Sequence, residues 1–303
     1  MTRKQRKGHI AVLTTNIIFG ANIPIAKTIL PLIVTPFVLI QFRYLGAVIC
    51  FWIVSFFTKK EHVPTKDLLT LFFASIFGVT LNQGSFIIGL EYSSAIDASI
   101  IITLTPVITM ILALLFLKEP ISFKKAFGVF LGLAGALLLI LASNEGSFKL
   151  NRNHLVGHLF CLLSCLSYAI YLTAFKNIIL KYSPITIMKW MFLFASIMFL
   201  PFSFKEVIAF DFTKLSIYNS LALIHVVFAA TFITYLLIPI GQKNIRPTTM
   251  TMYNNIQPLI ATIIGISLGK EHLTFPKIIA AILIFFGVYL VTISKSKVQE
   301  QTS

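Results

Sequence analysis

Apolar residues run along this chain in ten long stretches, which short polar turns separate. A helix of about 20 apolar residues crosses the hydrocarbon core of a bilayer. The pattern therefore predicts an all-α integral membrane protein with ten transmembrane helices and little chain outside them. The predicted spans cover residues 9–30, 36–57, 68–90, 94–117, 124–142, 156–175, 184–202, 217–241, 247–269 and 275–294.

The second half of the chain repeats the pattern of the first half. The phrase TPVITMILALLFLKEP at residues 105–120 returns as QPLIATIIGISLGKEH at residues 257–272, with a proline, an apolar run and Lys-Glu at matching positions. Each half holds five predicted spans. Because five is odd, the chain leaves the first half on the opposite side of the membrane, so the second half is inserted with inverted orientation. Inverted repeats of this kind occur in many secondary transporters. The predicted domains are a first five-helix repeat at residues 1–142, an inter-repeat loop at 143–155, a second five-helix repeat at 156–294 and a cytoplasmic tail at 295–303.

Composition changes this picture only by excluding a separate soluble domain. The chain is 57% hydrophobic and 12% charged, whereas an ordinary soluble protein has about 25% charged residues. The three cysteines all lie in apolar runs, where we expect them to pack, with no metal site and no disulfide. No cofactor is expected.

The net charge of +15 does not indicate a nucleic-acid partner. If the N-terminus is cytoplasmic, sixteen lysines and arginines lie in cytoplasmic segments and seven on the other side. Cytoplasmic loops are enriched in basic residues in membrane proteins. We therefore predict a multi-pass protein of the cell (inner) membrane with both termini cytoplasmic, for which the lipid bilayer is the partner.

Several stretches resemble a known family. The run GLEYSSAIDASIIITLTPVITMILALLFLKEPISFKKAFGVFLGLAGALLL is similar to the EamA repeat of the drug/metabolite transporter superfamily, as are FGAN at residues 19–22 and RYL at 43–45. The resemblance covers both halves and is stronger in the first, since His272 replaces the proline after the second Lys-Glu. It implies ten helices and the export or exchange of small metabolites, with no particular substrate.

Polar side chains inside the spans are the candidate site, because a polar group in hydrocarbon is costly unless it faces the bundle interior or a wet cavity. The ninth span has the densest cluster. Asn82 and Ser164 are also polar residues within spans. Polar residues between helices also form hydrogen bonds that simply hold the bundle together, and this alternative stays open. The predicted substrate-binding residues are Asn16, Asn22, Arg43, Gln83, Thr105, Tyr168, Tyr235, Tyr253, Asn254 and Gln257.

Two prolines at matched places strengthen this hypothesis. Pro106 lies in the fourth span and Pro258 in the ninth, 152 residues later. A proline inside a helix lacks one donor and frees a carbonyl in the preceding turn. Interrupted spans in corresponding positions of two halves point to a transporter binding site, so we expect both prolines to break their helices near the midplane.

Charged groups within the spans are few. Arg43 lies about seven residues inside the second span, where it either reaches outward to the membrane surface or faces the cavity and binds a carboxylate or phosphate. Lys189 is expected to reach the cytoplasmic interface. Aspartates and glutamates occur only near span ends, so proton coupling has no evident carrier. Exchange, facilitated passage and coupling through an end residue such as Asp97 remain open.

These features predict a secondary transporter that exports or exchanges small polar metabolites, such as amino acids, by alternating access. The alternative is a membrane-embedded enzyme acting on a lipid or prenyl substrate. The six histidines are scattered and have no acidic partner at helical spacing within a span, so no catalytic residue is assigned. No phosphate-binding loop of an ATP-driven pump occurs. Gly128 and Gly132 form a GxxxG pair, typical of close helix packing, with a homodimer contact as the alternative.

Overall fold

The structure, a computed structural model, describes residues 2–93, 98, 101–143, 152–267 and 274–294, and these residues form helices and no strand. The first half contains α1 (Arg3–Ile29), α2 (Pro36–Phe56), α3 (Thr65–Ser75), the π-helical segment η1 (Ile76–Leu81), α4 (Asn82–Tyr92), α6 (Thr105–Leu117) and α7 (Phe123–Ser143). The second half contains α8 (Arg152–Ala174), α9 (Lys176–Lys181), α10 (Pro184–Ile208), the 3-10 turn η2 (Phe212–Lys214), α11 (Ile217–Ile224), the π-helical segment η3 (His225–Ile233), α12 (Thr234–Asn244), α13 (Pro247–Met252), the 3-10 turn η4 (Tyr253–Asn255), α14 (Ile256–Ser267) and α15 (Phe275–Ile293).

Seven helices in the described part of the chain are long and apolar enough to cross a membrane. This confirms an all-helical, multi-pass membrane protein at the coarse level. The other three predicted spans are represented differently. Residues 94–97 and 99–100 lie outside the described part, and α6 covers the last 13 residues of the span 94–117. α7 covers 124–142 as one helix, and the predicted span 247–269 is divided into α13, η4 and α14. The ninth span is thus interrupted at residues 253–255, just before Pro258, where an interruption was expected.

Some helices extend beyond the predicted spans. α1 begins at Arg3 rather than at residue 9, because Thr2 caps it: the Thr2 side chain accepts a hydrogen bond from the Gln5 backbone, and the Gln5 side chain accepts one from the Thr2 backbone. Such a capping box satisfies backbone donors at a helix start. α10 continues to Ile208, past the predicted end at 202. Hydropathy marks the membrane-embedded part of a helix, whereas capping decides where the helix itself begins.

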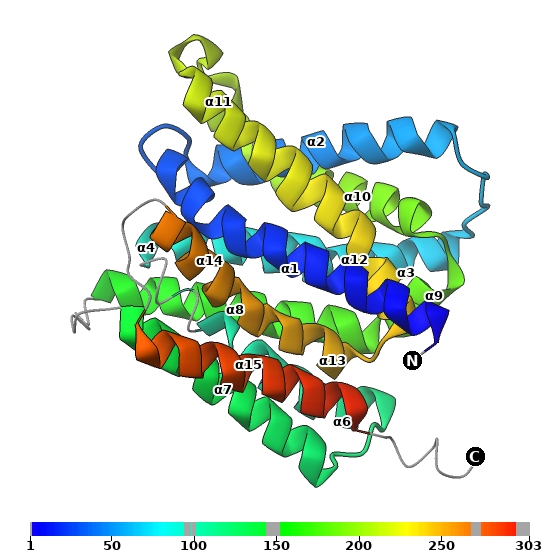
Figure 1. Ribbon diagram of the computed structural model, residues 1–303. Helices are drawn as coiled ribbons and strands as arrows, with labels where there is room; N and C mark the ends of the chain where they lie inside the picture. The colour runs from blue at the N-terminus through cyan, green and yellow to red at the C-terminus, as the bar shows by residue number, and fades with distance from the viewer. Residues whose placement is uncertain (1, 94–97, 99–100, 144–151, 268–273, 295–303) are drawn as a thin grey trace.

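The helices pack as antiparallel and crossing pairs along one common direction (Figure 1). α7 packs against α15, α2 against α10, α4 against α8, and α1 lies between α12 and α14. The start of α1, the connection between α2 and α3, and α9 lie on one side, whereas the connection between α1 and α2 and the start of α11 lie on the other.

The GxxxG glycines of α7 are used inside the molecule. A Cβ atom added to Gly128 would lie 2.9 Å from the Gly287 carbonyl oxygen of α15, and one added to Gly287 would lie 2.7 Å from the Gly132 nitrogen. Backbones approach this closely only where side chains are absent. The close-packing interpretation is therefore confirmed, while the homodimer stays a prediction that would need another surface.

Polar contacts join the two halves on the side where α1 begins. The Glu61 carboxylate, in the connection before α3, accepts hydrogen bonds from the Ser183 backbone nitrogen at 2.9 and 3.2 Å. Burial acts to raise the pKa of Glu61, but hydrogen bonds from Thr186 and Ser183 and the charge of Lys243 lower this pKa by more, so it falls below its usual value. Close by, Asp67 pairs with Lys181 and Tyr182. Electrostatic contacts thus close this side between α3, α9 and α10.

Candidate functional site

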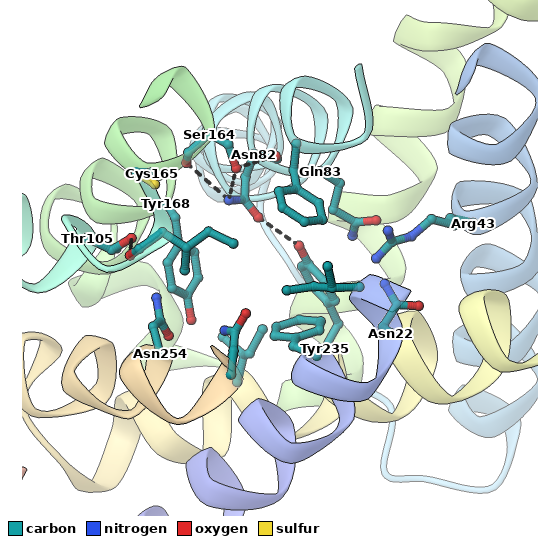
Figure 2. A pocket seen from close by; sticks show the side chains of 16 residues that line it. Asn22, Arg43, Asn82, Gln83, Thr105, Ser164, Cys165, Tyr168, Tyr235 and Asn254 are labelled. Carbon is teal, nitrogen blue, oxygen red and sulfur yellow. Dashed lines mark hydrogen bonds between the residues drawn. The ribbon is translucent and has the colours of Figure 1, made fainter. Parts of the chain in front are cut away.

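Polar side chains from both halves converge on one cavity in the middle of the bundle (Figure 2). The space within and around its mouth is about 650 Å³, but only about 80 Å³ can hold the centre of a water molecule, so the cavity is narrow. The lining residues are Phe19, Asn22, Ile23, Arg43, Asn82, Gln83, Phe86, Ile102, Thr105, Ser164, Cys165, Tyr168, Tyr235, Ile238, Asn254 and Gln257.

Eight of the ten residues predicted from the sequence line this cavity: Asn22, Arg43, Gln83, Thr105, Tyr168, Tyr235, Asn254 and Gln257. Asn16 lies behind the wall, where its side-chain oxygen accepts a hydrogen bond of 2.8 Å from the Gln257 amide. Tyr253 does not line the cavity, and its hydroxyl lies 2.8 Å from Nδ1 of His9. The tertiary structure thus brings together residues from seven predicted spans and separates Tyr253 from its neighbours.

Asn82 ties three helices together at the cavity wall. Its amide nitrogen donates to the backbone carbonyl and the hydroxyl of Ser164 in α8, both at 3.1 Å, and the Ser164 hydroxyl donates back to the Asn82 carbonyl at 2.7 Å. The Asn82 side-chain oxygen accepts from the Tyr235 hydroxyl of α12 at 3.1 Å. With all its groups used, Asn82 positions the ring of Tyr235 rather than offering free hydrogen bonds to a ligand.

The two π-helical segments supply acceptors for buried side chains. A π turn leaves backbone carbonyls without their usual helical donors, and such segments are frequent at functional sites. In η1, the Gly78 carbonyl accepts from Tyr235, while the Val79 carbonyl accepts from Tyr44, each at 3.3 Å. In η3, the Ala230 carbonyl accepts from Arg43 at 3.1 Å. Both segments therefore replace water as the hydrogen-bond partner of groups around the cavity.

Both prolines lie in the first turn of a new helix, beside the cavity. Pro106 follows Thr105 at the start of α6, and Pro258 is the third residue of α14, directly after the 3-10 turn η4. Proline at such a position lacks a donor that the first turn does not need. The neighbouring Thr105 and Gln257 face the cavity, so the interruptions place polar residues at its edge.

Cavity residues that the sequence did not select are mostly apolar. Phe19, Phe86 and Ile238 form parts of the wall, and Cys165, expected to pack, lies beside them. Apolar residues in a membrane span give no local signal of facing a cavity. Only the sequence repeat could have indicated that they face the cavity, because Phe86 and Ile238 are 152 residues apart, as are Pro106 and Pro258.

The lining is suited to holding a small molecule. It offers amides, hydroxyls, aromatic rings and one guanidinium, and no carboxylate lines it in the part of the chain that the structure describes. No group of three histidines, cysteines or acids that could hold a metal ion occurs among the described residues. Asp97, considered above as a coupling residue, lies outside them.

Comparison with known proteins gives this cavity a family context. An "Uncharacterized transporter YetK" of Bacillus subtilis (strain 168) is 21% identical over 299 residues, covering 98% of this chain and 90% of that protein. An "Uncharacterized transporter" of Archaeoglobus fulgidus is 25% identical, covering 85% and 88%. The WAT1-related protein At3g53210 of Arabidopsis thaliana is 24% identical, covering 97% and 87%.

A solved crystal structure shares the fold. It superposes with a TM-score of 0.76 at 15% sequence identity, over 95% of this chain and 98% of that one. The profile of the EamA-like transporter family matches this chain twice, at residues 6–141 and 155–293. Together these matches cover nearly the whole sequence, and the chain belongs to the EamA-like transporter family.

Proposed function

We propose that this chain is a secondary transporter that exports or exchanges small polar metabolites, such as amino acids, by alternating access. One observation carries the proposal: equivalent positions of the two halves line the same cavity. Gln83 and Tyr235 are 152 residues apart, as are Thr105 and Gln257, and all four side chains line it. A site built at the interface of two repeats can open to either side when the repeats rock against each other.

The helix packing supports two inverted five-helix repeats. Exchanging the halves turns the contact of α4 with α8 into that of α12 with α1, and both contacts exist. The contact of α6 with α8 likewise becomes that of α14 with α1. The π-helical segments correspond as well, because residues 76–81 of η1 plus 152 fall within η3. The two family matches lie on the two proposed repeats.

The names of the bacterial and archaeal relatives support transport as the activity. The proposed repeats are residues 1–142 and 156–294, joined by the 143–155 loop. We place the chain in the cell (inner) membrane with both termini cytoplasmic; the 295–303 tail lies outside the described residues. The contacts between Asp67 and Lys181 would then close the cytoplasmic side of the cavity.

Metabolite release tests the function directly. Cells that express the chain and cells that lack it are grown alike, and the medium of each is compared for small polar metabolites. We expect at least one amino acid or related metabolite to accumulate outside the expressing cells several-fold above the control. Equal media under conditions of verified membrane expression would contradict the proposal.

Reporter fusions test the inverted insertion. A reporter active only outside the cytoplasm is fused within the 143–156 loop or within the 203–216 segment, each of which follows an odd number of proposed spans. We expect activity at both sites, and none for a fusion in the 57–64 connection, which serves as the control. Cytoplasmic signals at both of the first two sites would exclude the inverted repeat.

A further inference from the structure

Arg43 carries the one charge that lines the cavity among the residues that the structure describes. Its side chain is 3% exposed and comes from the middle of α2. The ion pairs of the described part join Lys125 to Glu119 and Lys181 to Asp67, so Arg43 has no carboxylate partner there. A buried charge without a counter-charge is costly. A bound anion would therefore stabilise the Arg43 guanidinium.

The protein holds the guanidinium by only two of its donors. Nε donates to the Thr231 hydroxyl at 2.9 Å, and Nη2 donates to the Ala230 carbonyl at 3.1 Å, both in η3. A guanidinium has five N–H groups, and the others have no acceptor among the described residues. The segment η3 thus orients Arg43 while leaving donors for an acceptor inside the cavity.

Two buried amides lie at the same end of the cavity. Asn22 and Gln83 are 2% and 4% exposed, and Figure 2 shows both side chains beside the Arg43 guanidinium. Among the described residues, the oxygen of Asn22 and both polar atoms of Gln83 lack a hydrogen bond of normal geometry, although Gln83 lies close to the Tyr235 hydroxyl. Unpaired buried polar groups are uncommon in folded proteins and indicate an absent partner. The guanidinium and the amide nitrogens of Asn22 and Gln83 could all donate to one carboxylate, while the two amide oxygens could accept from water or from another group of the ligand.

The opposite end of the cavity combines an aromatic ring with neutral polar side chains. Tyr168 lies there with Thr105 and Asn254 (Figure 2), and Phe19 and Phe86 line the walls. These rings suit a flat or apolar body. An ammonium group would find only neutral oxygens, because the described lining has no carboxylate.

We propose that the cavity takes a carboxylate anion with an aromatic or apolar body, whose carboxylate binds Arg43 with help from Asn22 and Gln83. This proposal rests on the transport function proposed above, and within small polar metabolites it places organic anions ahead of the zwitterionic amino acids named there as examples. Binding neutralises the guanidinium, so the loaded site carries no net charge within the low-dielectric bundle. An anion is favoured over a zwitterion, whose ammonium group lacks a counter-charge, and over a cation, which Arg43 repels.

Three probes with one phenyl body separate these classes. Purified protein in detergent is titrated by calorimetry with 3-phenylpropionate, an anion, with phenylalanine, a zwitterion, and with 2-phenylethylamine, a cation. We expect 3-phenylpropionate to bind at least tenfold more tightly than phenylalanine, and 2-phenylethylamine to show no binding. Equal or tighter binding of the zwitterion or the cation, or no binding of the anion, would overturn the proposal.

Substitution of the arginine provides the second arm. Arg43→Gln is expected to weaken 3-phenylpropionate binding tenfold or more, because it removes the charge that the carboxylate contacts. The matched control is Lys189→Gln, which removes a cation from α10 that lies 5.0 Å from the Trp52 ring centroid and does not line the cavity. We expect this control to bind like the wild type. Unchanged binding by a folded Arg43→Gln protein would show that Arg43 only joins α2 to η3.

A conservative variant covers the case in which Arg43→Gln fails to fold. Arg43→Lys keeps the charge but loses the forked donor geometry, so we expect weaker binding with the same order of the three probes. A reversed order would overturn the anion site. Because binding is measured without transport, protein that binds the anion but releases no metabolite contradicts only the transport function. Protein that releases metabolites but prefers the cation contradicts only the anion site.

Discussion

Replacing Gly287 by alanine is expected to lower the free energy of unfolding by about 1–3 kcal/mol, the usual cost of overpacking a tight interior. The added Cβ would lie 2.6 Å from the Gly128 carbonyl oxygen and 2.7 Å from the Gly132 nitrogen. Both are backbone atoms and cannot rotate away, so α7 and α15 must move apart. Denaturant unfolding of the purified protein in detergent measures the change.

The matched control is alanine at Gly84 in α4. A Cβ there would have the Tyr44 hydroxyl as its nearest neighbour, at 3.6 Å, which is ordinary van der Waals contact. We expect Gly84→Ala to be at least as stable as the wild type, because it creates no clash and alanine favours a helix over glycine by about 0.5–1 kcal/mol. Equal stability of Gly287→Ala and the wild type would mean that α7 and α15 are not packed backbone to backbone.

Replacing Asn254 by alanine is expected to reduce metabolite release at least tenfold while the amount of protein in the membrane stays normal. Asn254 is 7% exposed, lines the cavity from η4, and its side chain makes no hydrogen bond among the described residues. Its loss should therefore remove hydrogen bonds to a solute more than hydrogen bonds that hold the fold. Release assays with quantified membrane protein measure the effect.

Asn219→Ala is the control for this experiment, because Asn219 lies in α11 and does not line the cavity. We expect it to release metabolites at the wild-type rate. The same assay on Tyr253→Ala tests the original hypothesis for the ninth span, and the position of Tyr253 outside the lining favours a smaller loss than for Asn254. Normal release by Asn254→Ala and by Gln83→Ala together would show that this cavity is not the transport site.

The ninth span shows where sequence reasoning reached its limit. On a continuous helix Tyr253 and Gln257 share a face, since residues four apart are neighbours. The 3-10 turn at residues 253–255 advances about 120° per residue instead of about 100°, and this changes which side chains point inward. Tyr253 turns to His9, while Asn254 and Gln257 line the cavity.

The third and eighth spans show a similar effect. Asn82 and Gln83 directly follow η1, and Thr234 and Tyr235 directly follow η3. Each π segment has more residues per turn than an α-helix, and this changes the direction in which the side chains after it point. Nothing in the apolar runs at 76–81 or 225–233 marks such a segment. The sequence repeat indicated only that residues 76–81 and 225–233 occupy corresponding positions in the two halves.

By itself, the sequence determined that this is a helical membrane protein with two similar halves, and it named most of the polar residues around the cavity. Long apolar runs have few alternatives in lipid, because backbone groups there must be satisfied within helices. Only the tertiary structure decided which polar groups meet, that Asn82 joins three helices, and that Arg43 has no acid beside it in the described part of the chain. Those facts depend on the rotation and crossing of helices, which close packing and irregular turns set and which hydropathy along one segment does not record.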